Sequence, residues 1–106
     1  MIVTTSNDIS GHAVTQYLGV VRGLVVRSPT IMQGISGGLK QLIGGNIGSY
    51  AEACEVARKE AYDRLIEHAE GLGADAVIAM RYDAAEFTSG VTEVLAYGTA
   101  VKIMKA

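Results

Sequence analysis

The chain has 106 residues, which is room for one hydrophobic core, so we expect a single domain over residues 1–106. A net charge of −2 without any run of Lys and Arg argues against nucleic acid as a partner, and a single cysteine, Cys54, excludes an internal disulfide framework and a Cys-x-x-Cys motif. The chain shows no signal-peptide pattern and no apolar run of membrane-spanning length, so we expect a cytoplasmic protein with no membrane partner.

Residues 13–27 predict a long strand, because Val, Tyr and Leu are dense there. Apolar residues occupy both its odd and its even positions, so neither face of the strand is expected to meet water. Gly19 and Gly23 interrupt the pattern. We interpret them as bends or points of close backbone approach, not as ligand contacts.

Ser28-Pro29 ends this strand, and apolar residues then recur at helical spacing from Ile31 to Ile43. Three glycines in that stretch weaken the pattern, so we expect a short, irregular helix. Residues 44–48, with the sequence Gly-Gly-Asn-Ile-Gly, are expected to form a loop.

A long helix is predicted to begin at Ser49, which has Glu52 three residues later in the spacing of a capping box. Gly73 is the expected end of this helix, with Gly71 as the alternative. On its wet side Glu55 with Lys59 and Glu60 with Arg64 stand four residues apart, in the order that favours ion pairs. Its buried stripe is predicted to comprise Tyr50, Cys54, Ala57, Ala61, Leu65, Ala69 and Leu72.

From Asp75 the apolar period changes to two, and a second strand of this kind follows over residues 93–103 after a polar turn near residues 88–90. The alternation places Ala76, Ile78, Met80 and Tyr82 on one face of the first strand and Val77, Ala79, Arg81 and Asp83 on the other. In the second strand Leu95, Tyr97, Thr99, Val101 and Ile103 share a face, opposite Val94, Ala96, Gly98 and Ala100. The two strands are expected to form a hairpin.

The predicted fold class is therefore α+β: an antiparallel sheet packed on one long helix, in the order strand, strand, short helix, long helix, strand, strand. The second face of this sheet is also apolar, while charged residues make up 19% of the chain against roughly 25% in an average soluble domain. We expect another copy of the chain to cover that face. The alternative is that the short glycine-rich helix folds over it within the monomer.

Several segments together resemble the YbjQ-type family of small prokaryotic proteins, which are described as heavy-metal-binding. They are Tyr17-Leu18-Gly19-Val20-Val21, Gly44-Gly45, Tyr50, Ala57-Arg58, Leu72-Gly73-Ala74-Asp75-Ala76-Val77 and residues 93–101, Glu-Val-Leu-Ala-Tyr-Gly-Thr-Ala-Val. The resemblance spans nearly the whole chain. It implies a homopentamer of dodecin-like subunits, a divalent metal ion as the ligand, and no established enzymatic activity.

One departure from that family concerns acidic residues. Some relatives carry an Asp-x-Asp-Tyr run where this chain has Arg81-Tyr82-Asp83-Ala84, although another branch has Arg at the first place, as here. If the two acidic residues formed the metal site of the family, this chain would lack half of it.

Heavy metals in proteins prefer Cys and His ligands that converge on one ion, but Cys54, His12 and His68 stand far apart in the sequence. Cys54 lies on the buried helix stripe and is interpreted as an inert core thiol. His68 lies near the C-terminal end of the helix, where the helix dipole favours a cation. It is interpreted as a solvated histidine. His12, at the entrance of the first long strand, is expected to be exposed and is kept as a candidate ligand.

In a pentamer one ligand per subunit becomes a ring of five. Asp83 and Glu93 are the candidates for such a ring, because they are acidic side chains on otherwise apolar strands. The alternative interpretation is an ion pair between subunits, in which Arg81 pairs with Asp83 or Glu93 and fixes the register of the interface.

A second candidate site is the stretch that enters the long helix, where backbone N–H groups could bind an anion or a small molecule. Its candidate residues are Gly44, Gly45, Gly48 and Ser49. The stretch matches neither a P-loop nor a dinucleotide-binding motif, and a plain chain reversal explains its glycines as well. No arrangement of nucleophile, base and acid is present, so we expect no enzyme. A structural or adaptor oligomer with a protein partner remains the alternative to a metal-binding role.

Overall fold

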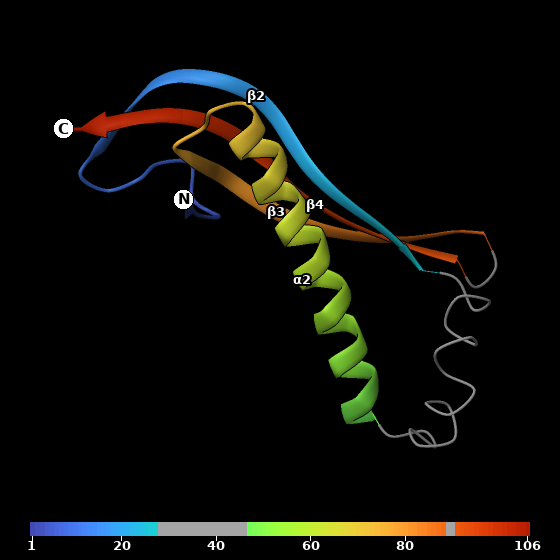
Figure 1. The fold of residues 1–106 in the computed structure, drawn as a ribbon. Helices are drawn as coiled ribbons and strands as arrows, with labels where there is room; N and C mark the ends of the chain where they lie inside the picture. The colour runs from blue at the N-terminus through green and yellow to red at the C-terminus, as the bar shows by residue number, and fades with distance from the viewer. Residues whose placement is uncertain (28–46, 89–90) are drawn as a thin grey trace.

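The computed structural model describes residues 1–27, 47–88 and 91–106. Its elements are β1 (Ile2–Val3), β2 (His12–Arg27), α2 (Ile47–Gly71), β3 (Ala76–Thr88) and β4 (Val91–Lys105). They form one four-stranded sheet with α2 packed on one face, so the predicted α+β class is confirmed (Figure 1). The short helix predicted between Ile31 and Ile43 lies outside the described residues, and so does the alternative that it covers the second face.

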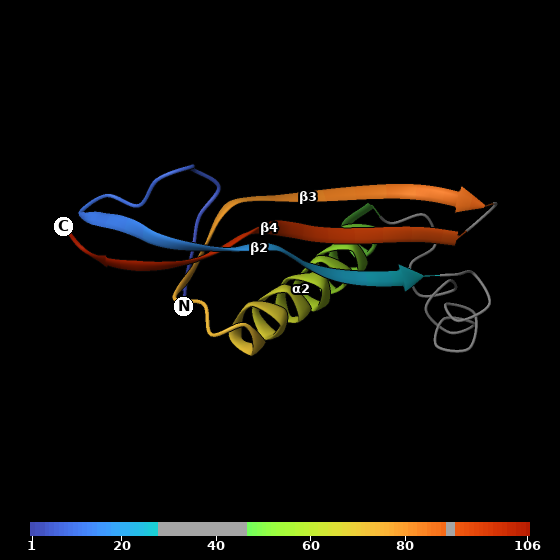
Figure 2. The same cartoon turned by 90° about the horizontal axis from the view of Figure 1, so that it is seen from above.

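The sheet has the strand order β1-β3-β4-β2, and Figure 2 shows β3, β4 and β2 side by side with α2 running obliquely across them. β4 pairs antiparallel with both β2 and β3, and the predicted hairpin is confirmed, because β3 ends at Thr88 and β4 begins at Val91. β1 pairs with β3 in parallel through Ile2↔Ala76 and Val3↔Val77. The sheet is therefore mixed, and the expectation of a purely antiparallel sheet was wrong because a two-residue strand leaves no periodic signal in the sequence.

The two glycines of β2 have the structural roles that the sequence predicts. Gly19 has a φ of 106° and lies where the pairing register with β4 shifts. Such a backbone conformation is open to glycine but costly for residues with a Cβ atom. Gly23 is buried directly beneath α2. The first glycine thus marks a bend in the strand and the second a close approach of two backbones.

Helix α2 begins at Ile47, two residues before the predicted Ser49, so Gly48 lies in the helix and not in a loop. The side chains of residues 47–53 are outside the described part, and with them the predicted capping box. The helix ends at Gly71, and Gly73 has a φ of 76°. The N–H of Gly73 donates to the Glu70 carbonyl (2.9 Å) and that of Ala74 to the Ala69 carbonyl (3.1 Å), which is the Schellman arrangement that closes helix C-termini.

The core lies between α2 and the sheet. Ala57, Ala61, Leu65 and Ala69 are buried as predicted, and the last three belong to one cluster with Val21, Val25, Val77, Met80, Ala96 and Ala100. Small residues on both layers let helix and strands approach closely. Two members of the predicted stripe are not buried: Cys54 is exposed and Leu72 is 44% exposed. α2 diverges from the sheet toward its N-terminal end, the half of the helix that contains Cys54, and Leu72 follows the end of the helix (Figure 1).

A β-bulge in β3 changes which side chains share a face. The register with β4 shifts between Ile78 and Arg81, and Ala79 has a φ of 53°. The segment after β1 holds this bulge, because the Ala79 N–H donates to the Ser6 carbonyl (2.9 Å) and the Met80 N–H to the Thr4 carbonyl (3.0 Å). As a result Arg81 and Asp83 lie on the same face as Ile78, and the predicted strict alternation fails beyond residue 78.

Among the described residues, the face of the sheet opposite α2, here called the helix-free face, is covered at one end. There Ile9 of the N-terminal segment packs on Ala76, Ile78 and Val101. Farther along, the face carries exposed apolar side chains, namely Val20 (71% exposed), Leu24, Val26 and Tyr97. Leu95 and Tyr97 share this face, and Ala96, Gly98 and Ala100 lie buried on the other, as the alternation of β4 predicts.

Candidate functional sites

The two candidate acidic ligands, Asp83 and Glu93, both lie on the helix-free face. Asp83 of β3 stands opposite Leu95, and Glu93 of β4 is two residues from that partner, so the two acidic residues are diagonal neighbours. Asp83 is exposed and Glu93 half-buried. One carboxylate oxygen of Asp83 accepts the N–H of Ala84 at 2.9 Å, which leaves its other oxygen for a further partner. The bulge in β3 is what brings Asp83 to this face.

Arg81 has a role within the single chain that the sequence did not predict. Its Nη1 atom donates to the carbonyl of Thr5 (2.7 Å) and to that of Met80 (2.8 Å). The guanidinium thus ties the N-terminal segment to the bulge in β3. Within the described residues it forms no ion pair with Asp83 or Glu93, and the ion pair between subunits stays a prediction.

His12, the third candidate ligand, is half-buried and not exposed as expected. Its Nδ1 atom lies 3.0 Å from the Ser10 carbonyl, and it pairs with Lys105 at the start of β2. Glu93 pairs with Val26 at the other end of that strand, and β-strands rise about 3.3 Å per residue. One chain therefore does not bring His12 to the acidic residues. In the described part of the chain no three His, Cys, Asp or Glu side chains are grouped as metal ligands.

His68 is exposed in the last turn of α2, where the sequence predicts a solvated histidine. Its Nδ1 atom accepts a hydrogen bond from the backbone N–H of Arg22 at 3.2 Å. Of the proposed anion site, Gly44 and Gly45 lie outside the described residues, while Gly48 and Ser49 lie in the first turn of α2. Anion binding there stays a prediction.

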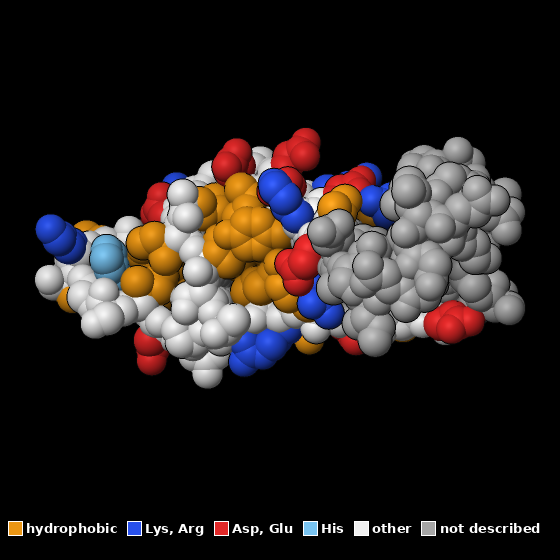
Figure 3. Space-filling model, turned by 90° about the horizontal axis from the view of Figure 1, so that it is seen from below, with side chains coloured by type: hydrophobic (Ala, Val, Ile, Leu, Met, Phe, Trp, Pro, Cys, Tyr) orange, Lys and Arg blue, Asp and Glu red, His pale blue; other side chains and the backbone are white. Residues whose placement is uncertain are grey.

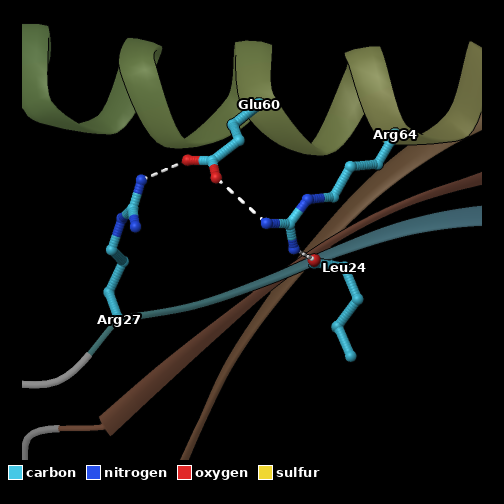
Figure 4. A network of polar contacts seen from close by, with 4 residues as sticks. All are labelled: Leu24, Arg27, Glu60 and Arg64. Atoms are coloured by element: carbon cyan, nitrogen blue, oxygen red, sulfur yellow. Dashed lines mark hydrogen bonds and ion pairs between the residues drawn. The ribbon is translucent and has the colours of Figure 1, made fainter.

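Two polar side chains of α2, Glu60 and Arg64, bind β2, the last strand of the sheet (Figure 4). Glu60 pairs with Arg27, and also with Arg64 at 3.1 Å, and Arg64 donates to the carbonyl of Leu24. The bond from Arg64 to the Leu24 carbonyl and the bond from the Arg22 N–H to His68 satisfy backbone groups that an edge strand otherwise exposes. The Glu60–Arg64 pair is confirmed.

The other predicted ion pair of α2, Glu55 with Lys59, is wrong. Lys59 instead pairs with Asp63 at 2.9 Å, a hydrogen bond that raises the pKa of the Lys59 ammonium, and Glu55 lies 3.7 Å from Arg58. The spacing of Lys59 and Asp63 is also four residues, so sequence spacing alone does not decide which acidic residue a lysine selects.

A groove of about 600 Å³ lies between α2 and β3, and sequence reasoning missed it. Its lining residues are Glu55, Val56, Arg58, Lys59, Tyr62 and Tyr82. Loss of water contact raises the pKa of the Tyr82 hydroxyl above its usual 10.0, and nearby Tyr62 and Glu55 act in the same direction. Seen from below the view of Figure 1, hydrophobic side chains gather in the middle of the molecule and charges of both signs border them (Figure 3). No local sequence pattern predicts the groove, because its two aromatic side chains, Tyr62 and Tyr82, come from different elements.

Comparison with known proteins relates the whole chain to one family. The model of the YbjQ family, described as "Putative heavy-metal-binding", matches residues 1–104. A UPF0145 protein of Legionella pneumophila (strain Philadelphia 1) is 58% identical over 103 residues, covering 97% of this chain and 98% of that protein. A UPF0145 protein of Solibacter usitatus is 51% identical over 104 residues, with coverages of 98% and 93%.

Among solved structures, a protein of unknown function from Pediococcus pentosaceus, assigned to the DUF74 family, aligns with a TM-score of 0.61. The alignment covers 98% of both chains at 18% sequence identity. That likeness concerns the fold alone. Within the described residues no helix has the length and apolar character needed to cross a membrane.

Proposed function

This chain belongs to the YbjQ family, and from that premise we propose that it is a homo-oligomeric binding protein that takes up a divalent metal ion through ligands from several subunits. The assembly in this proposal is a pentamer of dodecin-like subunits in the cytoplasm. Its role is binding and not catalysis. The description of the family supports the class of ligand.

The observation that carries the proposal is the helix-free face. Val20, Leu24 and Val26 are exposed there in a row on β2, and exposed apolar groups of this kind mark association surfaces. Burial of apolar surface against a second copy contributes roughly 25 cal/mol per Å² removed from water. The same face carries Asp83 and Glu93, so association through it gathers carboxylates from neighbouring subunits.

The proposed metal site needs ligands from more than one subunit. One chain offers two neighbouring carboxylates on this face, fewer than the three or four protein ligands of an ordinary zinc site. Repetition of Asp83 and Glu93 by rotational symmetry supplies the missing ligands. Carboxylate oxygens are hard ligands that Zn²⁺ also accepts, so we expect Zn²⁺ to bind and soft ions that require thiolates to bind poorly.

Sedimentation of the untagged protein at micromolar concentration tests the assembly. We expect a particle of five times the 11.1 kDa of one chain. Val20→Asp is expected to dissociate it, whereas Leu72→Asp, which places the same charge at an exposed site away from the strands, is expected to leave it intact. A wild-type protein that sediments as a monomer would end the assembly proposal.

Calorimetric titration of the chelator-treated protein with Zn²⁺, Ni²⁺ and Cu²⁺ tests the ligand. We expect saturable binding that Asp83→Asn together with Glu93→Gln removes. Asp63→Asn, which removes an acidic group from α2, serves as the matched control. Binding no tighter than the millimolar range in the wild type would refute the metal site and leave the assembly standing.

A further inference from the structure

The groove between α2 and β3 is a second candidate binding site, separate from the helix-free face. Five of its lining residues belong to α2, which diverges from the sheet toward its N-terminal end (Figure 1), and the sixth, Tyr82, belongs to β3. Its volume of about 600 Å³ falls within the 300–1,000 Å³ of small-molecule sites. All six lining residues belong to α2 or β3.

The walls of the groove are aromatic and apolar. Tyr62 projects from α2 and Tyr82 from β3, and Val56 of α2 contributes an exposed apolar side chain. Aromatic side chains prefer to contact another ring edge to face or in an offset stack. Two tyrosines on facing elements therefore form a receptive surface for a flat ring.

The charges at the rim differ in how firmly they are already paired. Lys59 is engaged by Asp63 at 2.9 Å, whereas the only ion-pair partner of Arg58 among the described residues is Glu55, 3.7 Å away. An arginine with so long a contact retains donors in the planar fork that binds carboxylates through two hydrogen bonds. The raised pKa of Tyr82 keeps its hydroxyl protonated at neutral pH, so this O–H adds a donor to the groove.

We propose that this groove binds a small aromatic carboxylate, with its ring against Tyr62 and Tyr82 and its carboxylate on the guanidinium of Arg58. The lining carries two cationic side chains and one anionic one, which favours an anion over a cation. A single negative charge fits better than two, because Glu55 borders the same space.

Isothermal titration of the full chain with naphthoate tests the proposal, in the presence of a chelator so that metal binding plays no part. We expect one naphthoate per chain with an affinity in the submillimolar range. Naphthol, which keeps the rings but lacks the charge, is expected to bind at least tenfold more weakly. The same is expected of a naphthyl trimethylammonium cation.

Two variants locate the site. Arg58→Gln is expected to weaken naphthoate binding at least tenfold, and Tyr82→Ala is expected to weaken it by a similar factor. Their matched controls, Arg22→Gln and Tyr17→Ala, alter exposed residues of β2 outside the groove and are expected to leave the affinity unchanged. Circular dichroism verifies that each variant is folded.

The proposal is overturned if naphthoate shows no saturable binding up to several millimolar, or if the cation binds more tightly than the acid. It is equally overturned if Arg22→Gln weakens binding as much as Arg58→Gln. None of these outcomes depends on whether a metal ion binds to the helix-free face.

Discussion

Gly23 of β2 and Ala61 of α2 meet backbone to backbone: a Cβ atom on Gly23 would lie 1.9 Å from the carbonyl oxygen of Ala61. It would also lie 2.5 Å from the backbone nitrogen of Leu65. Neither atom can move without shifting the helix. We expect Gly23→Ala to lower the free energy of unfolding by about 3 kcal/mol or more, measured by urea denaturation.

The control for this substitution is Gly71→Ala, because nothing lies within 4 Å of the added methyl group at the end of α2. Alanine there is expected to leave stability unchanged or raise it by up to about 1 kcal/mol. Similar losses of stability in the two variants would show that the close contact between Gly23 and Ala61 is not the reason why Gly23→Ala destabilises the fold.

Ala79 occupies a left-handed backbone conformation, with a φ of 53°, in the bulge of β3. That conformation costs a residue with a Cβ atom about 1 kcal/mol, and it costs glycine nothing comparable. We therefore expect Ala79→Gly to leave the free energy of unfolding unchanged or raise it by up to about 1 kcal/mol. Ala85→Gly, in a regular part of the same strand, is expected to lower it by about 0.5–1 kcal/mol, and equal losses would argue against strain at residue 79.

The ion pair between Arg27 and Glu60 joins the edge strand to α2, and the two side chains are 34% and 37% exposed. A double-mutant cycle with Arg27→Met and Glu60→Gln is expected to give a coupling energy of about 1 kcal/mol or less, because water and salt screen a pair so accessible. The coupling is expected to fall as salt is added. A cycle on the more exposed Lys59 and Asp63 should give a smaller value, and the reverse ranking would contradict this interpretation.

The raised pKa of Tyr82 makes stability depend on pH in the alkaline range. In the folded chain, loss of water contact favours the neutral hydroxyl, so the folded state holds this proton more tightly than the unfolded state does. The resulting stabilisation is present below pH 10.0, the usual pKa, and is lost as the pH rises through the folded value. Tyr82→Phe is expected to flatten this part of the stability profile, measured by urea unfolding between neutral and alkaline pH. A profile that Tyr82→Phe leaves unchanged would show that Tyr82 does not contribute to the pH dependence of stability.

The features predicted correctly depend on neighbours in the sequence. The alternation in β4 places Tyr97 and Ala96 on opposite faces of the sheet. This assignment needs no information on the partner strands, because successive side chains of any strand point to opposite faces. Glycine within a strand usually marks a bend or a close backbone approach, so Gly19 and Gly23 predict these two features. The end of α2 near Gly73 follows from the same kind of local rule.

The features that sequence reasoning missed depend on elements far apart in the chain. The bulge at Ala79 is held by carbonyls of the N-terminal segment, and nothing around residue 79 reveals it. Periodicity places Cys54 on one face of α2 but does not show that the helix diverges from the sheet toward its N-terminal end, and the Cys54 side chain is exposed (Figure 1). The groove joins Tyr62 to Tyr82 by tertiary packing alone. Of the candidate ligands, Asp83 and Glu93 come together only because the bulge turns Asp83 toward the face of Glu93.

The central place of β4 in the sheet has a consequence for biosynthesis. β4 follows β2 and β3 in the sequence yet pairs with both, and His12 meets Lys105 across almost the entire chain. While the ribosome is still translating residues before Val91, the apolar strand β2 lacks β4, with which it pairs in the described part of the sheet. Such long-range pairing slows folding and leaves strand edges open to aggregation. We therefore expect refolding to be slow, and shielding of β2 until β4 is available to reduce aggregation.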